Sequence, residues 1–325
     1  MELNKYILRR LFEITIIFFV IMTILFLLFR LAPGDPVSRM VDPSMTPEDA
    51  RHLIAQLGLD QPLGTQYLIY LKAFFQGDFG ISFHYGEPVL DIIAERLPNT
   101  IMLFTTSIIL AAFTGIFLGK IASWYKGKKI DTWLTIGALV CHTLFLPWLA
   151  LMMIWFFGFK IGWFPLNGII SAEIWINPDN GFFIRFLDVL HHMALPLMTL
   201  FIIHFGSYLL VMRSSMLETL KEDYIITARA KGLDEKVIRN HHAAPNAALP
   251  VVTSVALSLA FSINGGALTE TVFSWPGIGR ELVFAVSNND YPLALASFLL
   301  IASVVLLANL IVDILYAWLD PRIRY

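Results

Sequence analysis

The chain has 325 residues, of which 57% are hydrophobic and 15% are charged, and its formal net charge is −2. This composition excludes a water-soluble globular domain, whose surface at this size would need more charge. The only cysteine, Cys141, excludes an intramolecular disulfide bond. The distribution of charge along the chain is more informative than its total.

Six apolar segments follow one another along the chain. Each has roughly 20 residues or more, which at about 1.5 Å per residue crosses a hydrocarbon core of about 30 Å. Four contain no Asp, Glu, Lys or Arg, and the exceptions, Glu13, Arg30 and Lys120, lie near segment ends. The first apolar segment is too long for a cleaved secretory signal. We therefore expect an all-α polytopic membrane protein, a single transmembrane domain over residues 1–325 with spans near 11–31, 100–121, 133–159, 193–212, 249–269 and 291–312.

Positive residues indicate the orientation of these spans. Residues 32–99 carry four Lys or Arg against nine Asp or Glu, whereas the N-terminus, the second connector and the C-terminal tail are basic. Because Lys and Arg favour the cytoplasmic side, both termini and the connector 213–248 are predicted to be cytoplasmic. The loops 32–99, 160–192 and 270–290 are then predicted to lie outside.

Two short helices are expected in the first outer loop. In "MTPEDARHLIAQLGL", Thr46 is a candidate N-cap and Pro47 occupies the first helical position. "TQYLIYLKAFFQG" has amphipathic spacing and is expected to end at Gly77. Both helices are predicted to lie on or near the outer membrane surface.

Several kinds of chemistry can be weighed against the sequence. "GIFLGK", Gly115–Lys120, has the wrong spacing for a phosphate loop and lies in a predicted span, so small-residue helix packing is the preferred interpretation. Neither a histidine spacing suited to metal chelation nor a catalytic nucleophile motif is visible. The chain is therefore predicted to be no enzyme and to hold no cofactor or metal. His142 and His204 lie alone in spans, where helix packing is favoured over lining a path.

The span interiors carry almost no charge, which disfavours a charged-ring channel or a proton-coupled carrier. What remains is a permease whose energy comes from another protein. The polar segment Asp223–Pro250 is the candidate docking surface, because an ordinary connector needs only a few residues. Its first helix has acidic residues early and Gly232 at its end, and Asp234 can cap a second short helix. Leu233, Val237 and Ile238 are predicted to be apolar anchors for a partner. A surface hairpin packed on its own spans is an equally good alternative from composition alone.

Motifs along nearly the whole chain resemble the dipeptide/oligopeptide/nickel permeases of binding-protein-dependent ABC importers, in particular the first of the two paralogous permeases. These motifs are "RLAPGDP" (30–36), "GDFGIS" (77–82), "ERLPNT" (95–100), "TARAKGL" (227–233), "NAALPVVT" (246–253), "ETVFSWPGIGRELV" (270–283) and "NLIVDILYAWLDPRIRY" (309–325). Two positions depart from the common pattern. Ile226 stands where the general signature has Glu, and Pro245 stands where a basic residue is common.

The resemblance implies a type I importer permease fold in a prokaryotic inner or plasma membrane. It also implies a paralogous permease forming a heterodimer, two ATP-binding subunits that use ATP and Mg²⁺, and an extracytoplasmic binding protein. Membrane lipid surrounds such a chain, and no nucleic acid is expected. Site residues are carried over to matching positions. The ATPase-coupling residues would be Thr227, Ala228, Gly232, Leu233, Asp234, Glu235, Val237 and Ile238. A possible outer gate would contain Trp275, Pro276, Gly277 and Gly279, and a rigid turn anchored by Trp275 at the membrane interface is an equally good alternative.

The expected function is half of a translocation path for short peptides. Nickel or metal-chelate import by the same architecture is an alternative. A self-contained secondary carrier or channel and a non-transporting membrane scaffold are alternatives from other classes. Nothing in the spans identifies the cargo or the residues that line its path.

Overall fold

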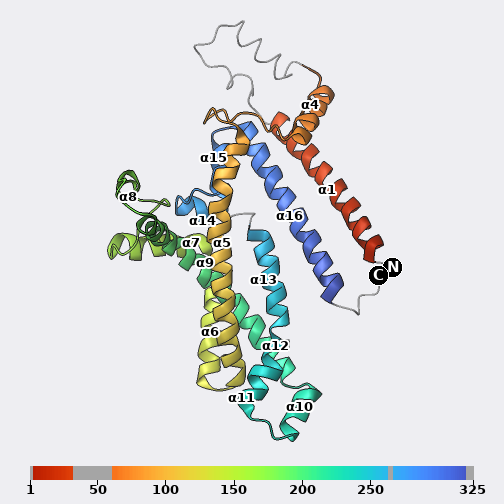
Figure 1. The fold of residues 1–325 in the computed structure, drawn as a ribbon, viewed down its shortest axis with the longest axis vertical. Coiled ribbons are helices and arrows are strands. Elements are labelled where there is room, and N and C mark those ends of the chain that lie inside the picture. Colours follow the sequence, from red (N-terminus) through yellow and green to blue (C-terminus); the bar gives the residue numbers. More distant parts are fainter. Residues whose placement is uncertain (1–2, 32–60, 263–265, 320–325) are drawn as a thin grey trace. The chain divides into compact units, whose positions relative to one another are not determined.

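A computed structural model describes residues 3–31, 61–262 and 266–319 (Figure 1). Apart from one isolated bridge between Ile81 and Pro88, regular structure in these ranges is helical, which confirms the all-α prediction. The α-helices are α1 Leu3–Leu31, α4 Leu63–Gln76, α5 Val89–Trp124, α6 Lys129–Thr143, α7 Leu146–Met153, α8 Ala172–Ile176, α9 Phe182–Thr219, α10 Asp223–Ala230, α11 Glu235–Val237, α12 Ala244–Ala247, α13 Leu249–Ser262, α14 Ala267–Val272, α15 Ile278–Ser287 and α16 Tyr291–Leu319. π-Helical turns cover Ile154–Lys160 and Ile238–Ala243.

Four of the described helices, α1, α5, α9 and α16, are long and apolar enough to cross a membrane. A fifth candidate is the pair formed by Lys129–Thr143 and Leu146–Lys160, which is bent by 98°. The apolar part of α13, Leu249–Leu259, is shorter. The count of six spans therefore stays a prediction, while the multi-pass helical class is confirmed.

The predicted span 133–159 is not one continuous helix in the structure. The chain leaves helical geometry at Leu144 and Phe145, where ψ is 134° and 112°. Pro147 explains the break, because in an unbroken helix its ring would clash with the carbonyl of Thr143 and its missing N–H would leave that carbonyl unpaired. In its place Pro147 sits in the first turn of α7, where a proline is tolerated.

The predicted fifth span, 249–269, is only partly helical in the described residues. α13 covers Leu249–Ser262 and α14 begins at Ala267, while residues 263–265 lie outside the described part. The predicted helix in "MTPEDARHLIAQLGL" also lies outside the described residues. The second predicted outer helix is confirmed as α4, and Gly77 ends it in the left-handed conformation at φ 76°.

The helices group into two compact units, and one of them joins the two ends of the chain. It comprises Met1–Leu97 and Glu281–Tyr325. In it, α1 packs against α16, with the rings of Phe29 and Tyr291 5.8 Å apart. α4 lies along α1, since the ring of Phe26 contacts Tyr67 and Tyr70 and the ring of Phe18 contacts Phe74. The first and last helices of the chain are thus neighbours.

The second unit, Pro98–Arg280, is built around α9. A Cβ on Gly119 would lie 2.7 Å from Met212 Cβ, and one on Gly115 would lie 2.7 Å from Tyr208 Cβ. On the side facing α6, a Cβ on Gly206 would lie 2.3 Å from the carbonyl oxygen of Ala138. Small residues therefore let the backbones of α5 and α6 approach α9 closely. This confirms the packing interpretation of "GIFLGK".

A buried ion pair also joins α6 to α9. Arg213 Nε and Nη2 donate to the two carboxylate oxygens of Asp131 at 2.6 and 2.9 Å. Asp131 is 4% exposed, and it also accepts from the backbone N–H of Gly127 at 3.0 Å. The carboxylate therefore ties together the turn before α6, α6 itself and α9.

The polar hairpin as a candidate docking site

The polar segment predicted to bind a partner folds as a compact helical hairpin, residues 223–247, here called the polar hairpin. α10 begins with Asp223 and carries Arg229 in its last turn, charges that complement the helix dipole. Gly232 follows at φ 77°, a left-handed conformation that favours glycine, and its N–H donates to the carbonyl of Arg229 at 2.9 Å. The predicted helix and its end are confirmed.

Two polar contacts fix the turn between the hairpin's helices. Asp234 accepts the backbone N–H of Lys236 at 2.6 Å, so it caps α11 as predicted. Glu235 Oε1 lies 3.0 Å from Arg229 Nε, an exposed ion pair that joins α11 to the end of α10. Thr227 lies on the exposed side of α10, where its hydroxyl donates to the carbonyl of Asp223.

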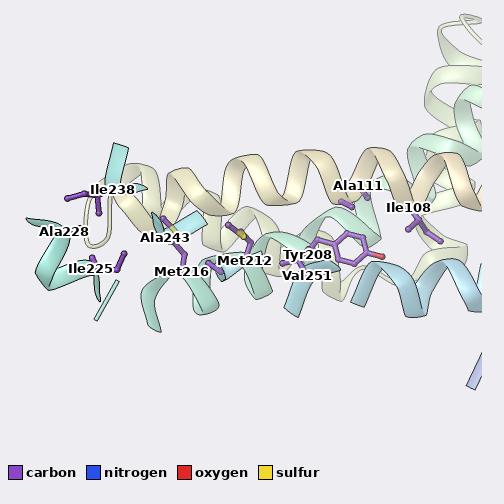
Figure 2. Packing of buried hydrophobic residues seen from close by; sticks show 12 residues of the cluster. Ile108, Ala111, Tyr208, Met212, Met216, Ile225, Ala228, Ile238, Ala243 and Val251 are labelled. Atoms are coloured by element: carbon purple, nitrogen blue, oxygen red, sulfur yellow. The ribbon is translucent and has the colours of Figure 1, made fainter. Parts of the chain in front are cut away.

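One face of the polar hairpin is continuous with the core of its unit. Ile225, Ala228 and Ile238 are buried, and they belong to the same hydrophobic cluster as Met216 and Met212 of α9. Figure 2 shows these side chains in an extended row that continues to Tyr208, Ala111 and Ile108. The hairpin is therefore packed on the long helices and is not a loose connector.

The opposite face carries exposed apolar side chains. Ile226 is 56% exposed, Tyr224 42%, Leu233 39% and Val237 38%. Apolar groups exposed to water cost hydration free energy that a partner's groove would recover on binding. Ile226, Leu233 and Val237 are what we call the apolar face of the polar hairpin; Tyr224 lies on the other flank of α10, where its hydroxyl accepts Asn246 Nδ2 at 2.9 Å.

The prediction that Ile238 is a partner anchor is wrong, because Ile238 is 0% exposed and belongs to the core. Neighbouring helical residues point about 100° apart, so Val237 and Ile238 cannot both face outward. Ala228 is likewise buried, at 6% exposed. The sequence reasoning missed Tyr224 and Ile226. The spacing of Ile225 and Ala228, three residues apart, was the signal that these two face inward and leave Tyr224 and Ile226 outside.

The turn predicted to be an outer gate is built around two buried side chains. Trp275 is 0% exposed, and its indole Nε1 donates to the carbonyl of Asn99 at 3.1 Å. Asn99 Nδ2 donates in return to the carbonyl of Pro276 at 2.9 Å. Trp275 and Asn99 thus hold the turn against α5.

Glu270 is the second buried group of this turn, at 0% exposed. Its carboxylate accepts the hydroxyl of Thr100 at 2.7 Å and the backbone N–H of Arg280 at 3.0 Å. Burial raises the pKa of Glu270, and these hydrogen bonds oppose that shift. A Cβ on Gly277 would lie 2.3 Å from Glu270 Oε1, and one on Gly279 would lie 2.8 Å from the backbone nitrogen of Ala267. The glycines thus make room for the carboxylate, whose role the sequence reasoning did not identify.

Of the described histidines, His192 lies beside a carboxylate, with its Nδ1 3.4 Å from Asp188 Oδ1. Among the described residues there is no group of three or more His, Cys, Asp or Glu side chains able to hold a metal ion. His204 stacks on Tyr208 with ring centroids 6.3 Å apart, which is a packing contact along α9. His192 Nδ1 lies 2.9 Å from the carbonyl of Asp188, one turn earlier in the same helix.

Long apolar helices with a packed polar hairpin between two of them define the class, a multi-pass α-helical membrane protein. Comparison with known proteins gives the family. Residues 111–325 match the family described as binding-protein-dependent transport system inner membrane component, and residues 3–104 match its N-terminal companion. The chain belongs to this family of transporter permeases.

Relatives match over essentially their whole length. The chain is 36% identical to a probable peptide ABC transporter permease of Sinorhizobium fredii, over 99% of this chain and 100% of that protein. It is 38% identical to a di/tripeptide transport system permease of Pseudomonas aeruginosa, over 99% of both chains. It is 37% identical to an oligopeptide transport system permease of Bacillus subtilis, over 98% of this chain and 99% of that one.

Proposed function

We propose that this permease forms half of an ATP-driven import path for short peptides. The observation that carries the cargo assignment is the end-to-end similarity to permeases named for di-, tri- and oligopeptides. The second half of the path would be a paralogous permease, and an extracytoplasmic binding protein would deliver the peptide. The chain would lie in the cytoplasmic membrane with both termini inside, as its basic residues predict.

The energy would come from two ATP-binding partner subunits that dock on the polar hairpin. Its buried face is continuous with α9, whereas its apolar face has free side chains that a groove can cover. A push on the hairpin would therefore move the long helices packed on it. Among the proposed coupling residues, Leu233 and Val237 would contact the partner, and Thr227 would lie beside them. The others would shape the hairpin, Ala228 and Ile238 through the core, and Gly232, Asp234 and Glu235 through the turn.

The turn around Trp275 would act at the outer end of the path. Trp275 and Glu270 are buried and hydrogen-bonded, which favours a turn that moves as a rigid unit over one that flexes. Pro276, Gly277 and Gly279 would set its shape.

The docking role is tested by co-purification with the candidate ATP-binding subunits in mild detergent. Ile226→Asp, Leu233→Asp and Val237→Asp, made one at a time, should each reduce retention of those subunits while the chain stays folded, because a carboxylate in an apolar groove is costly. Asn240→Asp is the matched control, since it adds the same charge at an exposed polar position of the same hairpin.

Equal retention by the control and the three apolar-face variants would contradict the docking role and favour a hairpin that serves only its own spans. Cargo is tested separately with the complete importer in proteoliposomes. ATP-dependent uptake of a labelled dipeptide is expected. Uptake of nickel or its chelates without dipeptide uptake would select the metal alternative, and uptake by this chain alone would select a secondary carrier.

A further inference from the structure

A cavity of about 370 Å³ lies within the unit formed by the two chain ends, between α1, α4 and the beginning of α16. Phe26 and Phe29 line it from the last turns of α1's candidate span, and Leu295 and Leu299 line it from the first turns of α16's candidate span. Its apolar walls therefore belong to two span ends, the depth at which lipid acyl chains meet their headgroups.

Arg30 gives this cavity a cationic end. It is the last residue of the candidate span Leu8–Arg30, and its Nε donates to the side-chain oxygen of Gln66 on α4. Among the described residues, no carboxylate forms an ion pair with Arg30. Asp78, the one acidic residue among the described residues of the lining, follows the opposite end of α4 and accepts the backbone N–H of Gly80. A guanidinium offers five N–H donors in a fork that matches a phosphate group.

Tyr70 supplies an unused hydrogen-bond donor in the same lining. Its hydroxyl oxygen is buried, and among the described residues it has no hydrogen-bond partner. A buried hydroxyl without a partner costs about 1–3 kcal/mol. Neighbouring atoms cover this oxygen in the structure, so a ligand with an acceptor oxygen below its anionic group would remove that cost once the side chains over the hydroxyl shift. Burial raises the pKa of Tyr70, so the phenol keeps its proton and remains a donor.

We propose that this cavity is a binding site for an anionic glycerophospholipid. The phosphate pairs with Arg30, an ester carbonyl accepts the Tyr70 hydroxyl, and an acyl chain lies against the phenylalanine and leucine side chains of α1 and α16. Tyr70 follows Gln66, the partner of Arg30, by one turn of α4, and its ring contacts Phe26 of α1. The cation, the phenol and the apolar wall thus follow one another as phosphate, ester and hydrocarbon do along a lipid. The proposal does not depend on peptide being the cargo.

The test is native mass spectrometry of the full-length chain with added phosphatidylglycerol, phosphatidylcholine or soluble glycerol phosphate. Phosphatidylglycerol should bind more tightly than phosphatidylcholine. Arg30→Gln should weaken phosphatidylglycerol binding by about 10- to 100-fold, the range of a lost charge-assisted contact. Arg30→Lys should retain most of the binding, and Ala73→Phe, which places a ring in the cavity, should weaken binding of both lipids. The matched control is Arg9→Gln, which removes the same charge from the exposed opposite end of α1.

Equal binding of the two lipids, or equal losses in Arg30→Gln and Arg9→Gln, would overturn the proposal, because binding would then be nonspecific. Glycerol phosphate binding as tightly as phosphatidylglycerol would also overturn it, since the acyl chain would then contribute nothing. Thermal unfolding without added lipid separates a folding defect of Arg30→Gln from lost binding. If that variant does not fold, Arg30→Lys and Ala73→Phe decide between the outcomes.

Discussion

The ion pair between Asp131 and Arg213 allows a quantitative test of how α6 is held against α9. Asp131 is 4% exposed, and its two oxygens receive two N–H groups from Arg213 and one from Gly127. Removing one partner of a buried pair costs about 3–5 kcal/mol. The Arg213 side chain is 25% exposed, so water recovers part of this cost and we expect about 2–3 kcal/mol for Arg213→Ala.

The measurement is a double-mutant cycle of Asp131→Ala and Arg213→Ala. The free energy of unfolding of each protein in the cycle is measured by thermal or denaturant unfolding in detergent micelles. We expect a coupling free energy of about 1.5–3 kcal/mol. The internal comparison is the Arg229–Glu235 pair, whose side chains are 45% and 54% exposed. An exposed pair of this kind contributes about 0.2–1 kcal/mol. Equal coupling free energies for the two pairs would show that burial and the two hydrogen bonds do not strengthen the Asp131–Arg213 pair.

Three further predictions concern close packing, backbone conformation and pH. Gly119→Leu should lower the unfolding temperature by several degrees, because even a Cβ there would lie 2.7 Å from Met212 Cβ. The control is Gly137→Leu, because a Cβ on Gly137 would meet no atom within 4 Å. Gly232→Val should reduce the coupling of ATP hydrolysis to transport, whereas Gly232→Asn should retain it, because φ is 77° and only the β-branched side chain resists the left-handed conformation. Glu270 has a raised native pKa, so its contribution to stability is full below its ordinary value of 4.5 and is lost as pH rises through the native pKa. As pH rises from 4.5 through the native pKa of Glu270, the unfolding temperature of Glu270→Gln should therefore fall less than that of the unmodified protein.

The class and the ends of several helices could be predicted from the sequence because they depend on local chemistry. Gly77 and Gly232 end helices through a conformation that glycine adopts at little cost, and Asp234 caps α11 through its own side chain. The break within the predicted span 133–159 was not foreseen because hydropathy alone cannot distinguish a straight apolar helix from one broken near Pro147.

What could not be predicted depends on which face of a short helix meets the core. Val237 and Ile238 are alike in composition, and only packing against α9 decides that Ile238 is buried. The contact between Glu270 and Thr100 joins positions far apart in sequence, and no local pattern announces it. Such a contact appears only once the tertiary structure is in hand.

The pairing of α1 with α16 has a consequence for how the protein is made. α1 emerges from the ribosome well before α16, which begins only at Tyr291. At about 5–20 residues per second, translation separates the two on the order of tens of seconds. Throughout that time α1 lies in the bilayer without α16, so lipid and α4, which is made earlier than α16, must be enough to stabilise it. Few of the apolar residues of α1 are buried by the rest of the described chain, which suits a helix that is inserted early and joined late.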